Sequence, residues 1–316
     1  MAARLSVIIP AYNAGVLLER TLESVLAQRS AAFEIIVIDD GSRDNTGEVA
    51  SRFGHRGVKL ISQPNSGQGA ARNAGIRAAV GEYVVFVDAD DIWFPWTLAC
   101  VQNAIDASPV LRPGLISGTV YAFHVESELE PIREASYQSR RWPTLLHAMP
   151  TIPLIPTMAT AVRTDLAQAA GGFLEERVNA EDVDFWLRLG DSPGFVQIQS
   201  PVLAGYRQTP GGLSCDMRRV RDGVVRLFER NAAGVYPGGS AMAANRRRFI
   251  AGHARPATLE CIQRGDLLRA VDLYRRTLPY SLNSFASLKW SVGVPVWMLT
   301  RGLSARWRAK ARSRRV

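Results

Sequence analysis

The sequence predicts an α/β fold, in which a mostly parallel open sheet carries helices on both faces and a helical region follows at the C-terminal end. Two observations predict it. Apolar, β-branched runs alternate with segments of helical periodicity through the N-terminal third of the chain, and after residue 216 the composition becomes arginine-rich and helical. We therefore expect a domain over residues 1–215, whose two parts meet between 111 and 112, and a helical region over 216–316.

The predicted strands are short buried runs, and the helices between them have apolar residues three or four positions apart. Asp44 is a candidate cap for the second helix. After residue 112 prolines interrupt the periodicity, which returns at 180–189, where Val183, Trp186 and Leu187 share one helical face. The strands are expected at 5–10, 34–38, 58–61 and 83–87, and the first three helices at 16–28, 46–53 and 69–80.

Composition and charge favour a folded enzyme over a nucleic-acid-binding or membrane-spanning protein. Of 316 residues, 47% are hydrophobic and 21% charged, and the formal net charge is +9. Seven basic residues and no acid follow residue 300, which leaves +2 for the remainder, so no nucleic-acid partner is expected. The N-terminal apolar run is too short for a signal peptide. The run at 290–299 is about half of the roughly 20 residues of a spanning helix.

Cysteine and histidine residues show no disulfide or metal-binding pattern. Cys100, Cys215 and Cys261 are far apart, no C-x-x-C pair exists, and the histidines lack the spacing of metal ligands. This usage fits a reducing compartment. The expected location is cytoplasmic, either free or peripheral at the inner face of the cell membrane.

Polar loops follow three predicted strands, at 10–13, 39–42 and 88–91. Because ligands of doubly wound sheets bind at the carboxyl ends of the strands, these loops are expected to form one site. Asp39 and Asp40 could accept hydrogen bonds from a base or ribose, although D-G-S is also ordinary turn chemistry.

Three acids, Asp88, Asp90 and Asp91, lie within four residues. Like charges this close repel, so the cluster is costly unless a cation or hydrogen bonds offset it. A magnesium or manganese ion, which binds one or two carboxylates together with substrate phosphates and water, would do so. The alternative is a solvated turn before a helix start, where the helix dipole favours acids.

Two further segments carry candidate site residues. Residues 65–73 supply small residues for close backbone approach and a helix start that can face an anion, with Arg72 one turn in. This segment does not follow the first strand, and G-K-[ST] is absent, so neither a dinucleotide Rossmann site nor a P-loop is predicted. Glu181 and Asp182 begin a helix, where acids are caps more often than catalysts.

Five segments together resemble the family 2 glycosyltransferases of the GT-A fold, which is Rossmann-like. The resemblance extends from about residue 5 to residue 214, and five motifs in order are far more specific than any one of them. The segments are SVIIPAYN at 6–13, EIIVIDDGS at 34–42, NSGQGAARNAG at 65–75, GEYVVFVDADD at 81–91 and GGFLEERVNAEDVDFWLR at 171–188.

This resemblance implies a metal-dependent, inverting transfer of a single sugar from a nucleotide-diphosphate sugar, expected to be a UDP-sugar. The implied acceptor is a glycan or lipid-linked molecule of polysaccharide biosynthesis. Asp182 would be the catalytic base, and Asp90 with Asp88 would hold a divalent metal, Mn²⁺ or Mg²⁺, with Asp90 the more direct ligand. The implied nucleotide-sugar-binding residues are Pro10, Ala11, Tyr12, Asp39, Asp40, Arg72, Asp88 and Ala89.

Three features concern how far the chain follows the family pattern. Thr209 stands where many relatives have the histidine of Y-R-x-H, so that histidine is missing from the expected metal ligands. Trp96 occupies a position that is often acidic, which is expected to alter the acceptor side. A Q-x-x-R-W sequence at 138–142 matches processive synthases but precedes Asp182 instead of following it, so a single-addition enzyme is favoured.

Two other functions remain open. A nucleotidyltransferase shares the parallel sheet and the acidic metal site, but it normally has a glycine-rich, basic loop after the first strand, which PAYNAG does not supply. A catalytically silent sugar-nucleotide-binding or membrane-scaffolding homologue would not hydrolyse a donor with any metal, and the presence of Asp90 and Asp182 argues against it.

The C-terminal tail is predicted to bind an anionic membrane. Leu299, Leu303 and Trp307 would form the apolar stripe of a helix among basic residues, the alternatives being a solvated basic end or a nucleic-acid patch. Each basic residue near such a surface contributes about 1 kcal/mol. Truncation after Thr300 should abolish sedimentation with anionic liposomes and spare UDP binding. Equal sedimentation of both chains in low salt would contradict the prediction.

Overall fold

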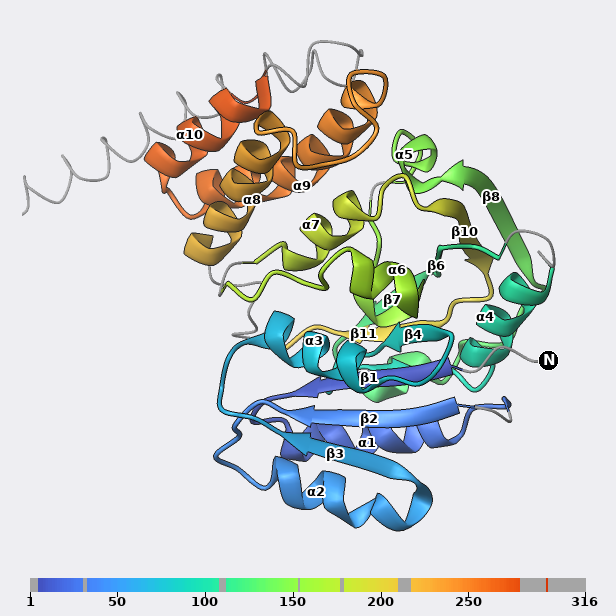
Figure 1. Cartoon of the computed structure of the whole chain (residues 1–316). Helices are drawn as coiled ribbons and strands as arrows, with labels where there is room; N and C mark the ends of the chain where they lie inside the picture. Colours follow the sequence, from blue (N-terminus) through green and yellow to red (C-terminus); the bar gives the residue numbers. More distant parts are fainter. Residues whose placement is uncertain are drawn as a thin grey trace, which may run out of the picture. The chain divides into compact units, whose positions relative to one another are not determined.

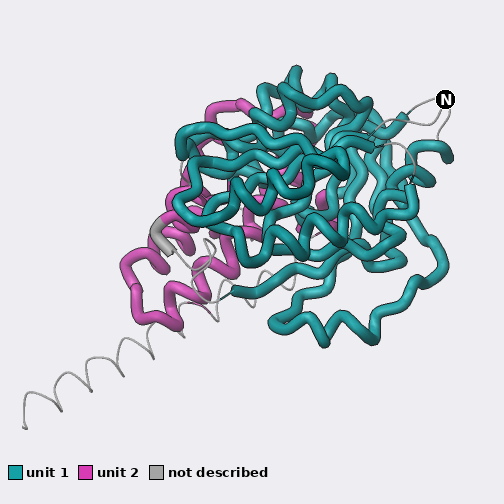
Figure 2. The backbone as a smooth tube through the Cα atoms, turned by 90° about the horizontal axis from the view of Figure 1, so that it is seen from below, with its two compact units in different colours: residues 1–148, 155–177, 181–212 teal, residues 149–154, 178–180, 213–316 magenta. Residues whose placement is uncertain are grey.

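The computed structural model describes residues 5–30, 33–107, 112–152, 154–176, 179–209, 217–278 and Val294. The chain divides into two compact units, teal and magenta in Figure 2. The tail stripe of Leu299, Leu303 and Trp307 lies outside the described residues. The first unit comprises Met1–Ala148, Ile155–Arg177 and Glu181–Gly212, and the second comprises Met149–Leu154, Val178–Ala180 and Leu213–Val316.

An eight-stranded sheet forms the centre of the first unit (Figure 1). Its strands are β1 Leu5–Ala11, β2 Phe33–Asp39, β3 Val58–Ser62, β4 Tyr83–Phe86, β6 Leu115–Ser117, β8 Gln138–Thr144, β9 Thr160–Arg163 and β10 Pro193–Ser200. They lie in the order β3-β2-β1-β4-β9-β6-β10-β8. The half formed by β3, β2, β1 and β4 is parallel, as the apolar runs predict. Strands β1, β2 and β4 are almost wholly buried, because a parallel sheet is covered on both faces.

Helices cover both faces of this parallel half. They are α1 Gly15–Leu26, α2 Thr46–Arg52 and α3 Gln68–Ala78, while α4 Thr97–Asp106 contacts β10 of the other half. Alternate residues of β2 point to opposite faces. Ile35 packs in the apolar cluster that contains residues of α1, α2 and α4, whereas Ile36 packs with Ala71 of α3. Asp44 lies one residue before the observed N-cap of α2, Asn45, and its Oδ1 accepts a hydrogen bond from the Thr46 N–H at 3.0 Å.

The other half of the sheet is mixed. Strand β9 runs antiparallel to β4 and β6, β10 is parallel to β6, and β8 pairs antiparallel with β10 at the edge. These strands fall where the sequence has no clear periodicity. In β8, which holds the Q-x-x-R-W sequence, Arg140, Arg141 and Pro143 are exposed, so no apolar alternation marks it. Short helices lie between the strands of this half: η2 Glu126–Leu129, α5 Leu145–Ala148, η3 Thr157–Ala159 and α6 Thr164–Ala169. A further short helix, η1 Gly54–Arg56, precedes β3 in the parallel half.

A three-stranded sheet links two segments that matter for the site. It consists of β5 Ile92–Trp93, β11 Ala204–Arg207 and β7 Val120–Phe123, in the order β5-β11-β7. Strand β5 begins directly after Asp91, and β11 ends with Arg207. Because the two strands pair, residues 116 positions apart in sequence come into hydrogen-bonding contact.

The remaining helices are α7 Glu181–Arg188 in the first unit, and α8 Met217–Ala232, α9 Ala243–Gln263 and α10 Leu267–Thr277 in the second. Residues 217–278 carry thirteen arginines and five acids. The basic charge is therefore shared between these helices and the tail, whereas residues 1–216 are acidic. No helix in the described part of the chain is both long and apolar enough to cross a membrane.

Candidate active site

The acidic loop, Asp88–Asp91, leaves the end of β4 and is held by its backbone. The Thr21 hydroxyl of α1 lies 2.9 Å from the carbonyl oxygens of both Ala89 and Asp91. The Asp91 side chain is fully buried, and its Oδ1 accepts a hydrogen bond from the Arg207 N–H at 2.8 Å. These contacts fix the loop between α1 and β11, so the directions of the remaining carboxylates are set by the tertiary structure.

The carboxylates of the loop repel one another. Burial and the neighbouring Asp88 raise the pKa of Asp90 to about 6, and burial with both Asp88 and Asp90 raises the pKa of Asp91. Among the described residues, no other residue donates a hydrogen bond to the Asp90 carboxylate. The Asp90 carboxylate is therefore available to a ligand.

Arg72 bridges the acidic loop and the E-D pair, Glu181 and Asp182. Its Nη2 donates to Asp88 Oδ1 at 2.7 Å and its Nη1 donates to Glu181 Oε1 at 2.9 Å. The guanidinium lies 5.2 Å from the centre of the Phe173 ring, and the side chain is 4% exposed. Burial lowers the pKa of Arg72, but the two carboxylates outweigh it and raise that pKa. Both terminal nitrogens of Arg72 donate to carboxylates, and the expectation that Arg72 faces a bound anion stays a prediction.

Helix α3 is docked on the segment that leads to α7. The Asn73 side chain donates to the Phe173 carbonyl at 2.9 Å and accepts from the Phe173 N–H at 2.7 Å. A Cβ on Gly69 would lie 2.0 Å from the Leu174 carbonyl oxygen, so only glycine allows this approach. Gln68 donates to Glu181 at 2.6 Å. The small residues of this segment therefore serve helix packing in the described structure.

The two acids of the E-D pair have different surroundings. Glu181 is buried between Gln68 and Arg72, and burial together with Asp182 raises its pKa to about 7 despite the opposing effect of Arg72. Asp182 is only half-buried. Its Oδ2 accepts from the Thr157 hydroxyl at 3.1 Å and its Oδ1 from the Val183 N–H at 2.7 Å. Of the pair, Asp182 has the more accessible carboxylate.

The two acids after β2 are occupied by the chain itself. Asp40 is 3% exposed and accepts three hydrogen bonds of 2.8 Å, from Gln63 Nε2 and from the Ser66 and Gly67 N–H groups. A carboxylate has about four acceptor positions, so roughly one remains for a ligand. Asp39 Oδ1 accepts from the Ser42 N–H at 2.9 Å. Both side chains shape the loops around the site, whether or not a nucleotide touches them.

The loop after β1 is joined to the loop after β2. Asn13, at φ 49°, accepts from the Arg43 N–H at 2.8 Å and donates its own N–H to the Ser42 hydroxyl at 3.0 Å. Pro10 is half-buried and Ala11 is buried. A ligand could therefore contact Ala11 mainly through its backbone atoms. Tyr12 is 48% exposed, so its ring is accessible at this loop.

Several residues of this network carried no sequence signal of their own, because each acts through a neighbour distant in sequence. Thr21, Thr157 and Glu126 are of this kind. Trp96 is buried, its Nε1 donates to the Val202 carbonyl at 2.8 Å, and it stacks on Phe94, while its expected effect on the acceptor side stays a prediction.

The donor chemistry of the acidic loop fits a hard divalent cation in part. No group of three or more His, Cys, Asp or Glu side chains with metal-binding geometry occurs among the residues that the structure describes. Asp88 and Asp90 supply two carboxylates, and magnesium or manganese binds one or two carboxylates when substrate phosphates and water complete the shell. The set thus suits an ion that arrives with a diphosphate.

The comparisons with known proteins agree with this geometry. Residues 6–153 match the model of glycosyl transferase family 2. Over 111 residues the chain is 43% identical to an uncharacterized glycosyltransferase of Nostoc sp. (strain PCC 7120), which covers 34% of each protein. The matches to curated relatives from Nostoc, Escherichia coli and Bacillus subtilis span 34%, 27% and 27% of those proteins.

Two solved structures resemble the whole fold. S. aureus TarS 1-349 in complex with UDP-GlcNAc has a TM-score of 0.68 and 18% identity, covering 96% of this chain and 92% of that one. The mannosyltransferase PcManGT from Pyrobaculum calidifontis, in complex with GDP-Man and Mn²⁺, has a TM-score of 0.56 and 21% identity, covering 98% and 88%.

These findings confirm the predicted α/β, GT-A type of fold. Residues 6–153 are similar to glycosyl transferase family 2. The chain spans about a third or less of the length of the curated glycosyltransferases that it matches first.

Replacing Arg72 tests the bridge. We expect Arg72→Met to lower the free energy of unfolding by about 3–5 kcal/mol, because Asp88 and the buried Glu181 lose their cation. Arg29→Met is the control, since Arg29 and Glu134 form an ion pair with 59% and 47% exposed side chains; a loss below about 1 kcal/mol is expected there. Equal losses for both variants in denaturant unfolding would contradict the importance of the bridge.

Proposed function

We propose that the chain transfers a single sugar from a nucleotide-diphosphate sugar to a glycan or lipid-linked acceptor, with inversion at the anomeric carbon. The observation that carries the proposal is the bridge of Arg72 between Asp88 and Glu181. The bridge brings Asp88, proposed to lie at the donor, and the segment that holds the candidate base Asp182 to the same edge of the sheet. A displacement at one carbon requires both groups to be close together.

For the donor, the proposed site is the edge formed by the loops after β1, β2 and β4. The exposed Tyr12 ring could lie against a base. The Ala11 backbone, Pro10 and the remaining hydrogen-bond acceptor position of the Asp40 carboxylate belong to the same loops and would contact the nucleotide. Asp39 shapes the turn beside them. The similar TarS structure contains UDP-GlcNAc, and this supports a UDP-sugar as the donor here.

For the metal, Asp90 and Asp88 would be the ligands from the chain, and Ala89 would present its backbone beside the diphosphate. A bound Mn²⁺ or Mg²⁺ would neutralise the charge that develops on the leaving diphosphate. The similar mannosyltransferase is a complex with Mn²⁺, which supports this choice of cofactor. Arg72 would act indirectly, since it orients Asp88.

For the acceptor, Asp182 would remove the proton of the attacking hydroxyl. Its carboxylate is only half-buried, whereas Glu181 is enclosed by Gln68 and Arg72. The Thr157 hydroxyl would orient Asp182. Attack on the face opposite the leaving group gives the proposed inversion. The basic residues of the second unit and of the tail would favour an anionic surface, on which a lipid-linked acceptor would be found.

Removing the Asp90 carboxylate should abolish metal-dependent donor binding. We expect Asp90→Asn to bind UDP equally with and without MnCl₂ in titration calorimetry, because the ion loses its link to the chain. Asp106→Asn is the matched control, since the Asp106 carboxylate of α4 accepts a hydrogen bond from Gln102. Manganese-enhanced UDP binding that survives in Asp90→Asn would refute the metal site.

Removing the Asp182 carboxylate should separate binding from turnover. We expect Asp182→Asn to reduce sugar transfer by about 10²–10⁴-fold while leaving UDP affinity nearly unchanged, the range for loss of a general base. Donor-sugar release followed by chromatography provides the measurement. Parallel loss of UDP affinity would instead indicate that Asp182 has a structural role. Consumption of a nucleoside triphosphate with release of pyrophosphate would favour a nucleotidyltransferase.

A further inference from the structure

We propose that Glu126 is a positioning residue for the acidic loop, acting through Arg207 to keep the Asp90 carboxylate open to its ligand. This role rests on the proposed function of the loop as the metal and donor site. Glu126 lies outside all five motifs, at the start of η2, and no sequence pattern marks it.

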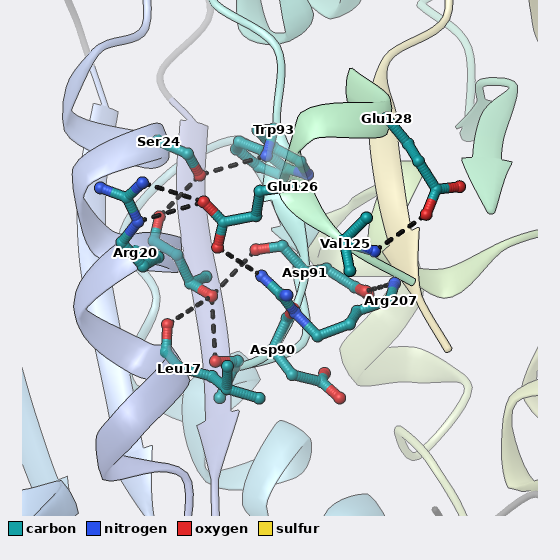
Figure 3. Close-up of polar contacts among 12 residues, drawn as sticks. Leu17, Arg20, Ser24, Asp90, Asp91, Trp93, Val125, Glu126, Glu128 and Arg207 are labelled. Atoms are coloured by element: carbon teal, nitrogen blue, oxygen red, sulfur yellow. Dashed lines mark hydrogen bonds and ion pairs between the residues drawn. The ribbon is translucent and has the colours of Figure 1, made fainter. Parts of the chain in front are cut away.

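Glu126 joins two arginines from different elements, as Figure 3 shows. Its Oε2 accepts from Arg20 Nε at 3.2 Å and Arg20 Nη2 at 2.9 Å, and its Oε1 accepts from Arg207 Nη2 at 2.8 Å. Although burial opposes ionisation, the bonds from both arginines lower the pKa of Glu126 and keep it anionic. Residues of α1, η2 and β11 are thereby connected through one carboxylate.

Arg207 is in turn the direct neighbour of the acidic loop. Its Nε donates to the Asp90 carbonyl at 2.8 Å, and its backbone N–H donates to Asp91 Oδ1 at 2.8 Å. The guanidinium lies 4.7 Å from the centre of the Phe123 ring, and the side chain is 10% exposed. The outer edge of the guanidinium is therefore fixed by Phe123 and Glu126.

The charge of Glu126 matters because Arg207 and Asp90 are opposite charges in close proximity. In Figure 3 the Asp90 carboxylate points away from the Arg207 guanidinium, whose Nη2 is bound to Glu126. Without Glu126, the guanidinium would be free to turn and pair with that carboxylate, because an oppositely charged partner would be the nearest alternative. Such a pair would occupy the oxygen atoms that a metal ion needs. Glu126 thus orients the loop without touching the ligand.

The test is Mn²⁺ binding by the full chain at saturating UDP, measured by titration calorimetry without turnover. Glu126→Gln keeps the size of the side chain and removes its charge. We expect it to weaken Mn²⁺ binding by about 10-fold or more, the range for residues that orient metal ligands. UDP binding without metal is expected to stay at the wild-type value.

The matched control is Glu134→Gln, which breaks an exposed ion pair with Arg29 that makes no contact with the acidic loop. Its Mn²⁺ affinity should stay within about twofold of wild type. Arg207→Lys is a second variant, which retains the positive charge but loses the geometry of the Nε donor, and it should weaken Mn²⁺ binding as Glu126→Gln does. Tm values of all variants check folding.

The outcomes separate this role from the proposed function. If Glu126→Gln and Arg207→Lys both bind Mn²⁺ with the affinity of the wild type, the role of Glu126 is overturned, whereas the proposed metal site is not. A wild-type chain whose Mn²⁺ binding does not respond to UDP, and equals that of Asp90→Asn, would overturn both. Weakened Mn²⁺ binding at an unchanged Tm supports a positioning role, which a merely structural ion pair would not produce.

Discussion

Repulsion between carboxylates at one edge of the sheet is the constraint on which the site depends. The acidic loop and the E-D pair place five acidic side chains there, and burial makes their mutual repulsion stronger than it would be in water. Two arginines offset it in different ways. Arg72 neutralises Asp88 and Glu181 directly, whereas Arg207 bonds to the backbone of the loop and leaves one carboxylate open. The arrangement therefore stabilises the cluster without saturating it.

The frame that brings these arginines to the acids is built mainly from close packing. Helix α3 reaches the segment before α7 because Gly69 has no side chain and because the amide of Asn73 matches the backbone of Phe173 on both its donor and acceptor sides. On the other side of the loop, the pairing of β5 with β11 carries Arg207 to Asp91. Both arginines also lie over aromatic rings, which limits their motion.

In the proposed function, the metal ion would meet the Asp90 carboxylate, to which no other described residue donates a hydrogen bond. A diphosphate would bring oxygen ligands for a hard cation, so two protein carboxylates would be sufficient. The proposed base, Asp182, lies beside Glu181 and therefore on the segment that Arg72 links to the acidic loop. The proposed positioning by Glu126 extends the same principle, since an anion holds a cation away from the ligand site.

Sequence alone determined the parallel half of the sheet, its helices and the identity of the acidic loop, because those features depend on local periodicity and on strand order. It could not locate β8 or β9, since exposed edge residues and antiparallel pairing with distant strands leave no period to recognise. Nor could it find the partners of Arg72 and Trp96. Only the tertiary structure decided them, because the partners of a buried side chain come from segments about a hundred residues away, as Glu181 is from Arg72. For the same physical reason the sequence could not predict the proposed role of Glu126, because that role depends on the two arginines that contact Glu126 only in the folded chain.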